Sequence, residues 1–103
     1  MTPTQLEAAL AAGHDLVVLD VREPEELERA SLPGALHVPM GQLPARAAEL
    51  PRDRLLVVMC HHGVRSAHAV AYLREAHGFE HLENLSGGID AWSCDVDPRV
   101  PRY

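Results

Sequence analysis

Short apolar runs alternate along this 103-residue chain with segments whose apolar residues recur at helical spacing. Continuous apolar runs at residues 16–19 and 55–59 predict strands that are buried on both faces. Shorter strands are predicted at 36–38 and, with a weaker signal, at 81–85. Strands that alternate with helices are typical of an α/β fold with a mostly parallel sheet.

The predicted helices carry signals at their ends. Thr2, Pro3 and Gln5 form a capping-box pattern that starts the first helix, and Gly13 ends it. Further helices are expected from Pro24 to Arg29, over residues 41–50, from Ser66 as N-cap to His77, and over 89–92. The charged face of the segment 24–29, which includes Glu26, is expected to be solvated. The tail, which contains Pro98 and Pro101, is expected to be extended and docked along an edge.

Size and charge narrow the possible classes of protein. The length suits a single domain over residues 1–103, and the net charge of −6 without a basic run argues against nucleic acid or an anionic membrane as partner. All nine cationic residues are arginine, which excludes lysine Schiff-base chemistry. There is no secretory signal and no apolar run of bilayer length, so the cytoplasm is the expected compartment.

The candidate chemistry follows the strand at 55–59, where Cys60 precedes Gly63, Arg65 and Ser66. Ligands bind at the carboxyl ends of strands in open α/β sheets. Backbone N–H groups of residues 61–66, the following helix N-terminus and the Arg65 charge would all lower the pKa of a thiol there. We therefore predict that Cys60 is a nucleophile that depends on inward-pointing amides and an accessible thiol. The alternatives are an inert core cysteine and, for Arg65, an ion pair with a carboxylate.

The spacing of the loop favours sulfur over phosphate. Four residues separate Cys60 from Arg65, whereas cysteine phosphatases use a loop one residue longer that surrounds a whole phosphate group. A smaller ring of amides fits a single sulfur atom on the cysteine.

The chain resembles the single-domain rhodaneses, or thiosulfate sulfurtransferases, over nearly its whole length. The segments that carry the resemblance are Leu-Asp-Val-Arg-Glu at 19–23, Leu-Pro-Gly-Ala at 32–35, Cys-His-His-Gly-Val-Arg-Ser at 60–66, Gly-Gly-Ile-Asp-Ala-Trp at 87–92 and Asp-Pro-Arg-Val-Pro-Arg-Tyr at 97–103. One departure precedes the second segment, where Ala30 and Ser31 replace the Gly-His that is common in the family.

The resemblance implies a central parallel sheet of about five strands with helices on both faces and Cys60 as a persulfide carrier. Thiosulfate, or a persulfide or polysulfide, would donate sulfur, and cyanide or a thiol would accept it, without a metal or organic cofactor. The implied substrate-binding residues are His61, His62, Gly63, Val64, Arg65 and Ser66. We expect Asp20 and Arg22 to brace the floor of the site through hydrogen bonds.

Several alternatives remain open on the sequence alone. The same fold could carry a phosphatase or arsenate reductase, or act without catalysis as a docking module or a sulfur carrier in a protein relay. A metal site of Cys60, His61 and His62 is disfavoured, because consecutive ligands suit tetrahedral zinc poorly. Cys94 is expected to be a bystander, and His37 a structural histidine. The physiological sulfur donor and acceptor are not encoded in a recognisable motif.

Overall fold

The computed structural model describes residues 1–103. Its centre is a parallel sheet of four strands in the order β2-β1-β3-β4. The strands are β1 (Leu16–Asp20), β2 (Leu36–His37), β3 (Leu55–Met59) and β4 (Leu82–Asn84). The helices are α1 (Pro3–Ala11), α2 (Pro24–Arg29), α3 (Leu43–Arg46), α4 (Val64–His77) and α5 (Gly88–Asp95), with 3₁₀ turns at Met40–Gln42 and Ala47–Glu49. The predicted α/β class is confirmed. None of the helices has the length and apolar character needed to cross a bilayer.

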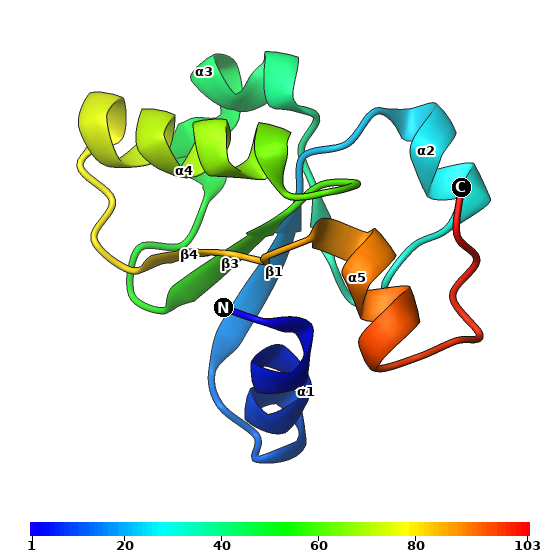
Figure 1. The fold of residues 1–103 in the computed structure, drawn as a ribbon. Coiled ribbons are helices and arrows are strands. Elements are labelled where there is room, and N and C mark those ends of the chain that lie inside the picture. Colours follow the sequence, from blue (N-terminus) through cyan, green and yellow to red (C-terminus); the bar gives the residue numbers. More distant parts are fainter.

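Helices cover both faces of the sheet, as expected (Figure 1). Successive strand residues point to opposite faces, so Leu19 and Val58 pack with α3 and α4. Val18 and Val57 pack on the other face with α1 and α5. The two apolar clusters enclose the strands so completely that Leu19, Val57 and Val58 are fully buried.

A single residue occupies the place of a fifth strand beside β4. The Met1 ammonium group donates a hydrogen bond to the Asn84 carbonyl oxygen at 3.0 Å, and the Ser86 N–H donates to the Met1 carbonyl oxygen at 2.8 Å. This is the bonding pattern of a parallel ladder, but Pro3 starts α1 before the pairing can extend. The sheet of about five strands is therefore present as four strands and one paired residue.

Two predicted helices differ from the observed ones. Residues 41–50 form three short helical pieces instead of one helix, because Pro44 has no N–H with which to continue a helix begun at Met40. The helix predicted from Ser66 begins at Val64 with Gly63 as its N-cap. Ser66 therefore lies within the first turn, and its hydroxyl is free for other partners.

The loop after β3 is held by the N-terminus of α5. The Ile89 N–H donates to the Cys60 carbonyl oxygen at 2.9 Å, and the Asp90 N–H donates to the His61 carbonyl oxygen at 3.1 Å. Gly88 makes this approach possible, since it has a φ of +63° and a Cβ there would lie 2.5 Å from the Cys60 carbonyl oxygen. The turn at residues 86–88 thus fixes the loop that contains the cysteine.

We predict that Gly88→Ala lowers the free energy of unfolding by about 3 kcal/mol or more, since it adds overpacking to backbone strain. Gly13→Ala is the matched control, because Gly13 also has a positive φ of +75° but a Cβ there would meet no atom within 4 Å. This control should cost about 1–2 kcal/mol. Urea unfolding of both variants measures the difference, and equal costs would contradict the close approach.

Candidate active site

The loop between β3 and α4 turns back toward the helix (Figure 1). Gly63, the residue before α4, makes this turn with a φ of +98°. A Cβ on this residue would lie 3.0 Å from the Gly87 backbone nitrogen, so the turn also needs the small residue for space. Because α4 begins directly after Gly63, the positive end of the helix lies beside the Cys60 side chain.

Cys60 Sγ accepts hydrogen bonds from the Gly63 N–H at 3.0 Å and the Ser66 hydroxyl at 3.3 Å. Burial is the largest single influence on the thiol and raises its pKa. Hydrogen bonds from the Ser66 side chain and from the N–H groups of Ser66, Gly63 and His62 together outweigh burial, so the pKa of Cys60 is lowered. The loop therefore favours the thiolate, which is the reactive form of cysteine.

The thiol is not accessible in this structure, contrary to the expectation from the sequence. Cys60 is 1% exposed, and none of the three cavities is lined by a residue from 60 to 66. The cause is the tight packing of the loop between α4 and α5.

Asn84, at the end of β4, is a neighbour of the site that the sequence analysis missed. Its Oδ1 accepts a hydrogen bond from the Ser66 hydroxyl at 2.5 Å, and its Nδ2 donates to the Gly63 carbonyl oxygen at 3.1 Å. Ser66 has a single hydroxyl hydrogen, for which Asn84 Oδ1 and Cys60 Sγ both compete. The position of Asn84 at the carboxyl end of a strand beside β3 was the available signal.

Arg65 forms the ion pair that the sequence analysis had considered as an alternative to substrate contact. Its Nη1 and Nη2 each donate to a carboxylate oxygen of Glu26 at 2.7 Å. The Tyr103 hydroxyl donates to the same carboxylate at 2.9 Å. The sequence predicted that Glu26 lies on a solvated face. This prediction is wrong, because α2 presents the Glu26 carboxylate to the loop. A role of Arg65 in substrate binding stays a prediction.

Arg22 and Asp20 form a buried pair that braces the side of the site next to α2. The Arg22 side chain is fully buried and donates to both Asp20 carboxylate oxygens, at 2.7 Å from Nη2 and 3.0 Å from Nε. It also donates to the Ala30 carbonyl oxygen and to the Tyr103 hydroxyl, both at 2.9 Å. The pair thereby connects β1, the end of α2 and the tail. His37 is a structural histidine, since its Nε2 bonds the Arg22 carbonyl oxygen at 2.7 Å.

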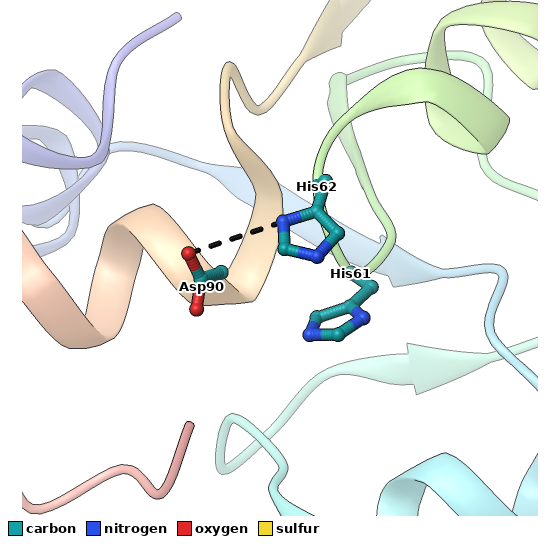
Figure 2. A group of neighbouring side chains, drawn as sticks. All are labelled: His61, His62 and Asp90. Carbon is teal, nitrogen blue, oxygen red and sulfur yellow. Dashed lines mark ion pairs between the residues drawn. The ribbon is translucent and has the colours of Figure 1, made fainter. Parts of the chain in front are cut away.

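Figure 2 shows His61 and His62 on the loop and Asp90 on α5, with His62 Nδ1 3.9 Å from an Asp90 carboxylate oxygen. Potential ligand atoms of these three side chains lie within 4.8 Å of one another. Arg102 already binds Asp90 at 2.9 Å, and the His61 ring stacks on Tyr103 with centroids 3.7 Å apart. A cation at this position would have to compete with the Arg102 guanidinium.

Other predicted residues lie at the surface. Val64 is 65% exposed at the start of α4, and Cys94 is exposed and unpaired on α5. The tail does dock on the rest of the fold, but it reaches the site itself: Tyr103 contacts α2, Arg22 and the loop. Tyr103 was missed as a site residue because no local pattern connects it to Cys60.

The fold and the loop define an α/β protein with a cysteine held in a four-residue cradle at the carboxyl end of a parallel strand. The rhodanese-like domain family matches residues 2–95, and the chain belongs to this family. A sulfurtransferase of Allochromatium vinosum is 41% identical over 88 residues, which cover 85% of this chain and 81% of that protein. A Mycobacterium tuberculosis protein named probable adenylyltransferase/sulfurtransferase MoeZ is 37% identical over all of this chain, which spans only 26% of MoeZ.

A rhodanese-related protein of Thermoplasma volcanium has the same fold, with a TM-score of 0.84 and 32% identity over 100% of this chain and 97% of that one. The relatives named as sulfurtransferases support a role in sulfur transfer. The resemblance inferred from the sequence is confirmed at the level of the family.

We predict that Ser66→Ala raises the pKa of Cys60, because it removes a donor to Sγ. Thiolate absorbance followed against pH measures this shift, in a Cys94→Ser background that leaves one thiol in the chain. Ser86→Ala, which alters an exposed serine in the turn before α5, is the control. An unchanged or lower Cys60 pKa in Ser66→Ala would show that Asn84 takes the hydroxyl hydrogen entirely.

A second prediction concerns the Glu26–Arg65 pair. The hydrogen bonds from Arg65 lower the pKa of Glu26 from 4.5 to about 2. A shift of this size corresponds to roughly 3 kcal/mol at most. Because Arg65 is 38% exposed and water screens the pair, we expect Glu26→Gln to lower the free energy of unfolding by about 1–2 kcal/mol at pH 7.

The stability difference between the wild type and Glu26→Gln depends on pH in a way that follows from the direction of the Glu26 pKa shift. Glu26 has a lowered pKa in the folded state, so its contribution is present above pH 4.5 and is lost as the pH falls through about 2. Urea unfolding of the wild type and Glu26→Gln between pH 7 and pH 2 should give curves that converge in acid. Glu25→Gln, on the exposed side of α2, should change stability by less than about 0.5 kcal/mol throughout. A difference that persists undiminished in acid would contradict the ion-pair assignment.

Proposed function

We propose that this chain transfers sulfane sulfur through a persulfide on Cys60. The observation that carries the proposal is the hydrogen bond of 3.0 Å from the Gly63 N–H to Cys60 Sγ, within a loop too short to surround a phosphate group. The hydrogen bonds that lower the pKa of Cys60 favour the thiolate, which is the form that the reaction needs.

In the first step the Cys60 thiolate attacks the outer sulfur of a donor such as thiosulfate. The S–S bond of thiosulfate breaks, its electron pair leaves with sulfite, and the outer sulfur remains on Cys60 as a persulfide. In the second step a nucleophile such as cyanide or a thiol attacks that outer sulfur and restores the Cys60 thiolate. A ping-pong sequence of this kind is the usual pattern of covalent catalysis.

The loop supplies electrostatic stabilisation without a proton donor. Sulfite is a good leaving group, so no general acid is needed, and the backbone N–H groups of residues 61–66 stabilise the anionic outer sulfur. The His61, His62 and Val64 side chains form the rim that a donor meets first. Burial lowers the pKa of His61, which disfavours a positive charge on this ring.

The main alternative chemistry is phosphate or arsenate transfer on the same fold. Four residues between Cys60 and Arg65 form a smaller ring than the phosphatase loop, and the guanidinium of Arg65 faces Glu26 instead of an incoming anion. Both observations favour sulfur over phosphate.

Sulfur relay to a partner protein is compatible with this proposal. A domain that passes a persulfide to a protein acceptor needs the same loop and the same cysteine, and MoeZ, whose name includes sulfurtransferase, contains a similar region within a longer chain. The carrier and the enzyme differ in turnover, not in the intermediate.

We predict that incubation with a sulfur donor, followed by intact-mass spectrometry, shows a gain of one sulfur (~32 Da) that is absent in Cys60→Ser. Cys94→Ser is the matched control and should retain the gain, since Cys94 is an exposed cysteine on α5 and not part of the loop. Cyanide added afterwards should remove the mass and release thiocyanate. Release of phosphate from an aryl phosphate, without any sulfur gain, would replace this proposal with the phosphatase.

A further inference from the structure

Every arginine around the loop is matched by one carboxylate. Arg65 is bonded to Glu26, Arg22 to Asp20, and Arg102 to Asp90, with shortest distances of 2.7, 2.7 and 2.9 Å. The rings of His61 and His62 are the remaining cationic candidates at the rim, and the pKa of His61 is lowered. Each guanidinium at the mouth of the site is therefore compensated by a carboxylate, although the mouth is rich in arginine.

Glu26 is the carboxylate that binds Arg65, the arginine of the loop. Besides Arg65, its oxygens accept from the Tyr103 hydroxyl and from the Glu23 N–H, each at 2.9 Å. The Glu23 contact belongs to the N-terminal turn of α2, and the Tyr103 contact comes from the tail, which ends beside α2 (Figure 1). The N-terminal turn of α2 and the tail thus hold the carboxylate in the position that binds Arg65.

This arrangement matters for a donor that carries two negative charges. Thiosulfate must approach a thiolate, and a free guanidinium would offset the repulsion between the two anions. With Arg65 bonded bidentately to Glu26, the loop offers thiosulfate only neutral amide dipoles. A persulfide, which carries one negative charge at most on its sulfur, is repelled less.

We propose that Glu26 is a specificity-determining residue that holds Arg65 away from the donor, so that the site selects persulfides over thiosulfate. This rests on the proposed function and names its donor class. The Cys60 thiolate attacks the outer sulfur of R–S–SH, the donor S–S bond breaks, and its electron pair leaves on the thiolate R–S⁻. The proton stays on the transferred sulfur, which becomes the outer atom of the Cys60 persulfide.

The test compares two donors, thiosulfate and the persulfide of 2-mercaptoethanol, in single-turnover reactions. The rate of sulfur gain on Cys60 is followed by intact-mass spectrometry. The wild type should react faster with the persulfide, and Glu26→Gln should raise the thiosulfate rate, relative to the persulfide rate, about tenfold by releasing Arg65. The increase should shrink as salt is added, because exposed charges are screened.

Two matched variants separate the released arginine from other effects. Glu25→Gln removes the same charge from the exposed side of α2 without freeing Arg65, and should leave the donor ratio within about twofold. The double variant Glu26→Gln/Arg65→Gln should lose the gain in thiosulfate rate. Circular dichroism at the assay temperature establishes that each variant is folded.

The possible results are distinct. A wild type that prefers thiosulfate, a donor ratio unchanged in Glu26→Gln, or a gain that persists in the double variant would each overturn the assignment of Glu26. Absence of sulfur on Cys60 with both donors would instead overturn the proposed function. A tenfold change in the ratio that requires Arg65 supports both.

Discussion

The close approach of the α5 N-terminus to the cysteine loop is the constraint on which the site depends. Two backbone N–H groups of α5 bond the carbonyl oxygens of Cys60 and His61, and Gly88 leaves the space that this requires. With its carbonyls occupied on that side, the loop can turn the Gly63 N–H toward the sulfur. The chemistry of one thiol thus depends on a glycine turn almost 30 residues further along the chain.

The charged side chains around the loop are also held by contacts between segments that are far apart in the sequence. Glu26 and Arg22 belong to the first part of the chain, Arg65 to the loop, and Tyr103 to the tail, yet they form one connected network. Such a network is costly to disrupt, because removal of one partner leaves the others unpaired. It stabilises the fold, and it keeps the Arg65 guanidinium bonded to Glu26.

The sequence predicted most helices and strands correctly, but it predicted few of the contacts between side chains. Buried strands, the start of α1 and the end of α4 at Gly78 follow from local patterns of hydrophobicity and capping, and all are present. The pairing of Glu26 with Arg65 could not be derived, since it depends on how α2 packs against the loop. Tyr103 could not be derived for the same reason, whereas Asn84 could have been noticed from its place at the end of β4. Ser66 was predicted to be the N-cap of α4, but Gly63 is the N-cap.

Burial of Cys60 disfavours the thiolate, whereas a reactive cysteine needs it. A thiolate in an apolar core would be unstable, so an exposure of 1% on its own would indicate an inert cysteine. Here the donors that lower the pKa of Cys60 come from the loop and from Ser66, so groups directly beside the sulfur stabilise the anion at a buried position. These donors are short-range dipoles, and the charge of Arg65 is compensated by Glu26. The proposed transfer of sulfur therefore relies on a donor that fits the loop closely, and long-range attraction between opposite charges contributes little to it.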